Sequence, residues 1–193
     1  MRWLAALILL LTAAPVVLAE PAVLTSGDVL RGRFVQERHM QGFANPIRSE
    51  GVFVVAPGRG LIWRAETPFA VTTVVTPTGL VQSVAGAETT RLPASRLPFL
   101  SKLYDMMAGA LAGDWKALEG SFTVNRGAGT VLLSPLRADD PTAAQILSIS
   151  ARMSRFVDEV EIKKPNGDFD RLVFKDQVLN AQPLDAAEAA QLK

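Results

Sequence analysis

Apolar and polar residues alternate along most of this chain, in short runs that glycine or proline interrupts about every ten residues. Alternation with a period of two is typical of strands that have one buried face. Between residues 97 and 111 the apolar spacing changes to three and four, which predicts a helix. The pattern therefore predicts about ten antiparallel strands with one strongly apolar helix inserted among them.

The predicted strands fall into two groups. Those before the helix are 30–38, a strand running through Val55, 61–64, 69–76, 80–84 and 88–92. Those after it are 121–125, 130–134, 146–153, 156–164 and a last strand with Leu172, Phe174 and Val178 on one face. Asn166-Gly167 predicts a type I′ hairpin turn, because both residues tolerate a positive φ. Asp185 is expected to cap a short alanine-rich helix.

A single long antiparallel sheet has two faces, and one of them must be covered. The predicted fold is therefore α+β: one curved antiparallel sheet of about ten to eleven strands, with helices covering the concave face. The helix at 97–111 has two interpretations at this point. It packs as ordinary core, or it forms a lid over an acyl-sized cavity, for which the flexible Met106-Met107 pair is well suited.

The first residues predict export. Met1-Arg2 precedes an uncharged stretch that is rich in leucine and ends in Val17-Leu18-Ala19. A basic start, a short apolar centre and a small-residue exit are typical of a secretory signal peptide. We expect residues 1–19 to be removed by cleavage after Ala19, which leaves a single domain at 20–193 in the periplasm. Because the sequence has no cysteine, we expect no lipid anchor.

Composition argues against several classes of function. The 20 basic and 19 acidic residues show no block of one sign, so a nucleic-acid-binding stripe is not expected. Without cysteine, the single His39 cannot complete a zinc site. The serines lack a partner base, and we interpret the acidic clusters as turn residues; they are Asp139-Asp140, Asp158-Glu159 and Asp168-Phe169-Asp170. We predict no catalytic residues, no metal and no cofactor.

A specific set of motif residues lies between residues 30 and 84. It consists of Phe34-x-Gln36, Ser49-x-Gly51-x-Phe53, Pro57, Trp63 and Pro68. In order and spacing these residues resemble the start of the LolA/LolB-type fold, and Pro98-Phe99 and Asp114-Trp115 resemble its middle section. The chain is thus similar to a divergent member of the LolA-like periplasmic outer-membrane lipoprotein carriers.

The resemblance implies a hydrophobic half-barrel that binds acyl chains of lipoproteins, or a related lipid-like cargo, and moves the cargo toward the outer membrane. It implies an inner-membrane ABC transporter as donor and an outer-membrane acceptor, and we expect a monomer. Carried over by position, the residues that line or support the cavity are Phe34, Phe53, Leu61, Trp63, Phe69, Leu100, Leu103, Met106, Met107, Leu172 and Phe174.

One departure leaves the cargo open. Ala56 precedes Pro57 where the family has an arginine associated with latching the lid. Another acylated or polyene lipid is therefore an alternative cargo. The alternative function is a regulatory sensor or protein-interaction module that uses the same half-barrel. An enzyme acting on sugars or lipids would need a paired acid and base, which we do not find.

Overall fold

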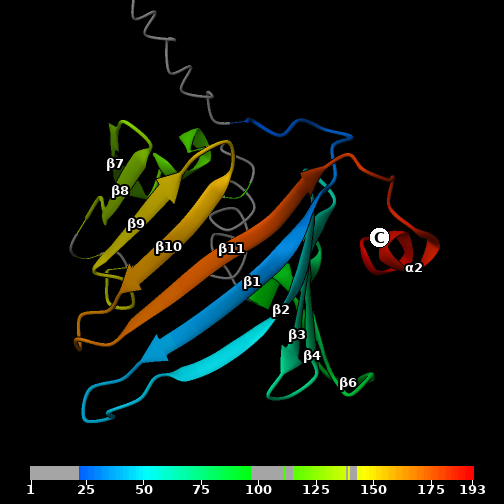
Figure 1. The fold of residues 1–193 in the computed structure, drawn as a ribbon, viewed down its shortest axis with the longest axis horizontal. Helices are drawn as coiled ribbons and strands as arrows, with labels where there is room; N and C mark the ends of the chain where they lie inside the picture. Colours follow the sequence, from blue (N-terminus) through cyan, green and yellow to red (C-terminus); the bar gives the residue numbers. More distant parts are fainter. Residues whose placement is uncertain (1–21, 97–110, 112–114, 138, 140–142) are drawn as a thin grey trace, which may run out of the picture.

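A computed structural model describes residues 22–96, 111, 115–137, 139 and 143–193. These residues form one 11-stranded antiparallel sheet with short helical segments around it (Figure 1). The strands are β1 (Leu30–His39), β2 (Ile47–Ala56), β3 (Gly60–Thr67), β4 (Val71–Thr76), β5 (Gly79–Val84), β6 (Ala87–Pro93), β7 (Phe122–Gly127), β8 (Thr130–Pro135), β9 (Ser148–Met153), β10 (Val157–Lys163) and β11 (Phe169–Leu179). The helical segments are η1 (Ala94–Arg96), η2 (Lys116–Leu118) and α2 (Ala186–Gln191).

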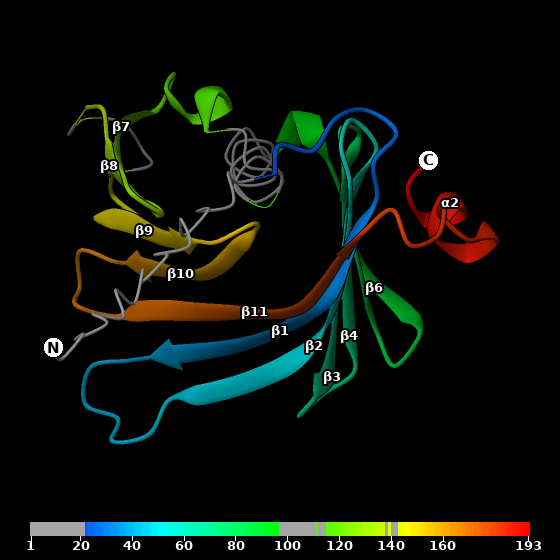
Figure 2. The same cartoon turned by 45° about the horizontal axis from the view of Figure 1, so that its top comes forward.

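The strands follow the order β6-β5-β4-β3-β2-β1-β11-β10-β9-β8-β7. The first and last strands of the chain are therefore neighbours in the middle of the sheet. The two ends of the order, β6 and β7, do not pair with each other, so the sheet stays open. Figure 2 shows it curling into a half-barrel. The predicted fold class is confirmed, with eleven strands.

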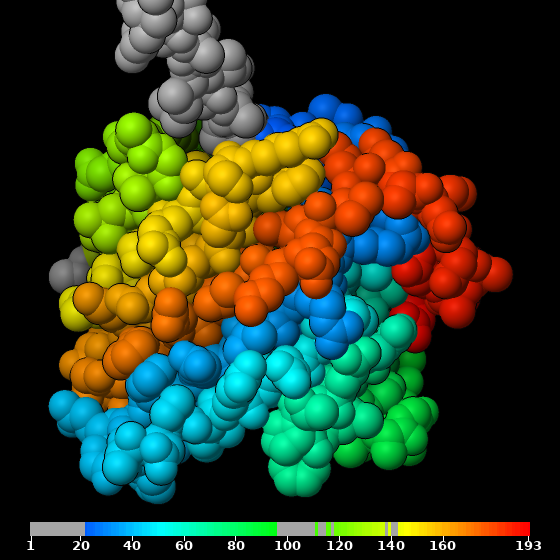
Figure 3. Space-filling model, viewed as in Figure 1, coloured from blue at the N-terminus to red at the C-terminus, as the bar shows by residue number. Residues whose placement is uncertain are grey.

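Two kinds of surface follow from the alternation of side chains along the strands. On the concave side, Leu30, Phe34, Phe53 and Phe174 belong to one buried apolar cluster. On the convex side, Glu159 forms ion pairs with Arg152 at 2.6 Å and with Arg171 at 2.9 Å, which links β9, β10 and β11. Figure 3 shows these strands forming a continuous outer surface. The polar positions of the strand pattern therefore face water.

The convex side also carries a smaller apolar cluster, which α2 covers. Its buried members are all aliphatic: Val29, Val54, Ala56, Ile62, Val74 and Leu192. Asp185 caps α2 as predicted, and Glu188 completes a capping box by accepting from the Asp185 backbone N–H at 3.0 Å. The sequence analysis placed helices only on the concave face, so the position of α2 is an addition to that prediction.

The hairpin at Asn166-Gly167 is confirmed, but its predicted turn type is wrong. Only Gly167 has a positive φ, of 84°, and its N–H donates to the Lys164 carbonyl at 3.1 Å. Pro165 presets a negative φ for the first central position of a type I turn. The turn therefore starts one residue earlier than predicted, and Gly167 provides the left-handed residue that rejoins the strands.

The predicted face of Val178 is also wrong, because β11 contains a bulge. Asp176 has a φ of 51°, and the register with β1 shifts between Arg31 and Arg33. An extra residue reverses the alternation beyond it. Val178 consequently turns outward and is 50% exposed, while Leu179 packs against the concave cluster.

Candidate functional site

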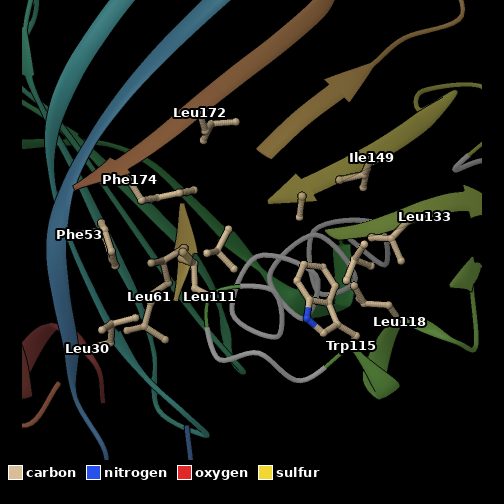
Figure 4. Close-up of a cluster of buried hydrophobic side chains, with 14 of the residues drawn as sticks. Leu30, Phe53, Leu61, Leu111, Trp115, Leu118, Leu133, Ile149, Leu172 and Phe174 are labelled. Atoms are coloured by element: carbon tan, nitrogen blue, oxygen red, sulfur yellow. The ribbon is translucent and has the colours of Figure 1, made fainter. Parts of the chain in front are cut away.

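The concave apolar cluster is the main candidate site, and it extends across most of the sheet (Figure 4). Strands β1 to β3 contribute one wall, and β7 to β11 contribute the other. Leu24, Leu111, Trp115 and Leu118 join the cluster from outside the sheet. The described cluster therefore forms a curved apolar surface facing chain segments that do not belong to the sheet.

Four aromatic rings form the centre of this surface. The rings of Phe34 and Trp63 stack with centroids 3.7 Å apart. Phe174 meets both Phe53 and Trp63 edge-on, at centroid distances of 5.5 and 6.2 Å. Stacked and edge-to-face pairs add to the energy of area burial. Phe34, Phe53 and Phe174 are buried, whereas Trp63 is only half-buried.

Two glycines make this aromatic group possible. Gly32 lies opposite Phe53 across the β1–β2 ladder, and Gly51 lies opposite Phe34. A Cβ at position 32 would lie 2.7 Å from the Phe53 ring, and one at position 51 would lie 1.9 Å from the Arg64 carbonyl oxygen. The Gly51-x-Phe53 motif therefore has a physical meaning: the Phe53 ring lies over Gly32, and Gly51 leaves room for the close approach of the β3 backbone at Arg64.

The chain segment facing this surface brings one polar atom into the cluster. Trp115 starts η2, and its carbonyl accepts from the Leu118 N–H at 3.2 Å, which fixes the backbone next to the ring. The side chain is 5% exposed, and its Nε1–H is buried without an acceptor in the part of the chain that the structure describes. In Figure 4 this nitrogen lies on the side of the ring turned toward Leu61 and Leu111.

A charged group marks the end of the concave face near the β10–β11 hairpin. Asp170 is 7% exposed and accepts hydrogen bonds from Arg38 Nε and Lys164 Nζ, both at 2.8 Å. Burial by itself raises the pKa of the Asp170 carboxyl, but the bonds from Lys164 and Arg38 outweigh it, so the pKa lies below its ordinary value. This carboxylate is a strand residue, so its interpretation as part of a turn cluster is wrong.

The structure brings together most of the predicted site residues that it describes. Phe34, Phe53, Leu61, Leu172 and Phe174 are buried members of the concave cluster, and Trp63 packs against it. Phe69 lies apart, in the β3–β4 connection, with 73% of its surface exposed. The predicted residues of the inserted helix lie outside the described residues; they are Leu100, Leu103, Met106 and Met107.

Sequence reasoning missed the contribution of the second half of the sheet. Its members are Phe122, Val131, Leu133, Ile149, Ala151 and Val157. Their signal was available, because Val131 and Leu133 alternate with exposed neighbours in β8, as Ile149 and Ala151 do in β9. The resemblance concentrated attention on residues 30–84, so these alternations were assigned to strands but not to the site.

The described residues offer no metal centre. They contain no group of three or more histidine, cysteine, aspartate or glutamate side chains arranged to hold an ion. His39 instead stacks on Phe169 with ring centroids 4.1 Å apart and lies 3.7 Å from a Glu37 carboxylate oxygen. The acidic side chains Asp158 and Asp168 form local hydrogen bonds with Ser154 and Asn166.

A second hollow lies on the convex side, between α2 and the β4–β6 strands. This groove has a volume of about 920 Å³, and hydroxyl and charged groups contribute much of its lining. Its residues include Thr72, Thr76, Ser83, Arg91 and Gln191, and none of the described residues that line it is aromatic. A hydrocarbon ligand fits the aromatic concave surface better than this mixed lining. Among the described residues, no helix has the length and apolarity to cross a bilayer.

The comparisons with known proteins identify structural likeness alone. No protein-family model matches the sequence, and no curated protein matches it. Among solved structures, the chain is similar to a LolA superfamily protein from Nitrosomonas europaea, with a TM-score of 0.47 and 7% identity over 91% of this chain and 93% of that one. The resemblance seen in the sequence agrees with this finding.

Two further structures show lower scores. One is a protein domain from Vibrio parahaemolyticus, assigned to outer membrane lipoprotein sorting, with a TM-score of 0.40 and 10% identity over 86% of this chain and 92% of that one. The other is the MucA/MucB complex of Pseudomonas aeruginosa, with a TM-score of 0.35 and 15% identity over 86% of this chain and 57% of that one. The candidate site therefore rests on the geometry of this chain.

Proposed function

We propose that this protein is a carrier that binds acyl chains of a lipoprotein, or of a related lipid-like cargo, against the concave face of its half-barrel. The observation that carries the proposal is the continuous apolar cluster on the inner side of a sheet that does not close. Trp63 belongs to the aromatic centre of that cluster. It is only half-buried, so part of its side chain is available to a ligand.

The energetics favour a binding role. Transfer of hydrocarbon out of water contributes about 0.8 kcal/mol per CH₂ group, so a cavity of modest size suffices for tight binding of a long chain. An open sheet also provides an entrance, since β6 and β7 lie at opposite ends of the strand order. Release then requires a receiver with a better apolar site or a covering segment that opens readily.

The proposal also includes the cellular location of the carrier and its two partners. The basic start and the apolar run that follows it support export to the periplasm; residues 1–21 lie outside the described part of the chain. A cargo with acyl chains moves between membranes, so we propose a donor at the inner membrane, such as an ABC transporter, and an acceptor at the outer membrane. No catalytic step is needed for this transfer.

The test combines cargo identification with a matched pair of variants. Native mass spectrometry of the protein purified from its own host should detect bound lipid or acylated protein. A fluorescent fatty-acyl probe should bind saturably, and Trp63→Arg should abolish this binding, because a cation would be placed on the apolar surface. Val178→Arg, an equally large change on the convex side, should leave binding intact. A clean mass together with no saturable probe uptake would refute the carrier proposal.

A further inference from the structure

The indole N–H of Trp115 is the one buried donor side chain of the concave cluster that has no acceptor among the described residues. A buried indole N–H normally finds a partner. Leaving it without one costs about 1–3 kcal/mol. An unpartnered buried donor in a native fold needs an explanation. One explanation is that a bound ligand supplies the acceptor.

A trapped water is the simplest alternative partner for this N–H, and the described side chains of the cluster argue against it. The buried residues that form the cluster with Trp115 have hydrocarbon side chains: Leu111, Leu118, Leu133 and Ile149 are among them. A trapped water needs two to four polar partners, and among the buried side chains described for this cluster only Trp115 carries a polar group, its N–H. An acceptor that enters attached to hydrocarbon meets both requirements, because its apolar part is bound by the cluster and its oxygen by the indole.

The position of the donor is fixed. Trp115 lies at the start of η2, where hydrogen bonds from Leu118 and from Glu119 to backbone carbonyls hold the short turn. Leu118, on the same turn, is buried in the cluster. The N–H lies on the side of the ring facing Leu61 and Leu111, which is the direction of the aromatic wall (Figure 4). The donor and the aromatic wall therefore belong to one buried cluster, and in this view the N–H lies on the side of the ring nearer the wall.

We propose that Trp115 Nε1–H donates a hydrogen bond to the carbonyl oxygen of an ester- or amide-linked acyl chain. This inference rests on the proposed carrier function, and it names the carbonyl oxygen as the chemical group that the site recognises. The hydrocarbon lies toward Phe34, Trp63 and Phe174, and the carbonyl lies at η2. The site therefore distinguishes an acylated cargo from a bare hydrocarbon or a polyene, which offers no acceptor.

The experiment compares two ligands that differ in the carbonyl. A long-chain alkane and the methyl ester of the fatty acid of matching length compete with a fluorescent acyl probe for the full chain. The wild type should prefer the ester by about three- to tenfold, the range expected for one net hydrogen bond. Trp115→Phe removes the donor and keeps an apolar ring, so it should abolish the preference by weakening ester binding and leave alkane binding unchanged.

Val178→Phe is the control, because it changes an exposed residue on the convex side and leaves the Trp115 donor and the concave cluster in place. It should retain the preference for the ester. An independent readout is the indole Nε1–H resonance of Trp115 in a nitrogen–proton correlation spectrum, assigned by its loss in Trp115→Phe. This resonance should move downfield when the ester binds and stay in place when the alkane binds.

The outcomes separate the two proposals. If the alkane binds but wild type shows no preference for the ester, or Trp115→Phe keeps that preference, the carrier function stands and the hydrogen bond is overturned. An ester that binds without moving the Trp115 resonance overturns it as well. If neither ligand binds, the carrier proposal fails and the inference fails with it. A thermal melt of Trp115→Phe matching that of wild type shows that loss of the preference does not come from unfolding.

Discussion

The two faces of strands β1 to β4 arise from the same alternation of residues but carry different kinds of apolar cluster. The convex face carries a small aliphatic cluster, which α2 covers by burying Leu192. Arg31 fastens that helix: its guanidinium donates to the Glu188 carboxylate and to the carbonyls of Gln182 and Pro183. The concave face carries aromatic rings and a half-buried Trp63, and it belongs to the same cluster as Trp115, whose buried N–H has no acceptor among the described residues.

The difference indicates which face is complete without a partner. On the convex side, the chain supplies both the cover and the hydrogen bonds that hold it, so this face needs nothing further. On the concave side, the described residues leave one buried donor, the Trp115 N–H, without an acceptor. A structural core and a binding surface can therefore share a sheet, and the state of their polar groups separates them better than their hydrophobicity does.

The largest effect is expected from the buried centre of the concave face. Phe53→Ala should lower the free energy of unfolding by about 3–5 kcal/mol, because the ring is fully buried against Phe174 and above Gly32. Urea denaturation followed by circular dichroism measures this change. Val178→Ala is the control, and it should change stability by less than about 0.5 kcal/mol. A loss below about 1 kcal/mol for Phe53→Ala would mean that Phe53 lines a void instead of packing.

A smaller effect should follow on the convex face. Leu192→Ala should cost about 2 kcal/mol, at the low end for a buried leucine, because it lies at the end of a short helix that frays easily. Binding of the fatty-acyl probe should be unchanged, since α2 lies on the side away from the concave cluster. A variant that stays folded but loses probe binding would show that the two faces are coupled, contrary to the comparison above.

The smallest effect concerns acid. The hydrogen bond from Arg31 holds the pKa of Glu188 below its ordinary value. A carboxyl with a lowered folded-state pKa adds stability that is fully present above its unfolded pKa, about 4.3, and is lost as pH falls through the folded pKa. Wild type should therefore lose this contribution below about pH 4, whereas Glu188→Gln, already weaker at neutral pH, should lose less over the same interval. Parallel melting curves of the two proteins from pH 7 to 3 would contradict this assignment.

The sheet itself could be read from the sequence because its signals are local. The turns at Pro57–Gly60 and Pro77–Gly79, together with the period-two runs between them, place β2, β4 and β5 within a residue or two, whereas β3 continues to Thr67, three residues beyond its predicted end. The carboxylate cap at Asp185 was equally legible, since capping involves residues only three positions apart. The aromatic members of the site followed from the same alternation once a concave face was assumed.

The remaining features depend on contacts that are distant in the chain. The bulge at Asp176 forms in the pairing with β1, more than 140 residues away, so the alternation of β11 alone misplaces Val178. The docking of α2 depends on Arg31 in β1, which no pattern within residues 180–193 reveals. Likewise, the missing acceptor of Trp115 is a property of the folded surroundings and leaves no trace in residues 111–118.

The open strand order affects how the protein behaves at high concentration, where molecules could associate through their edge strands. Each terminal strand has a ladder partner on one side within the described sheet, and unpaired strand borders invite a second molecule to add its own strand. In β6 this border bears an exposed ion pair between Glu88 and Arg91, and the strand finishes at Pro93, which has no N–H to offer. Charge and proline discourage such stacking. The open strand order thus comes with edge residues that oppose polymerisation.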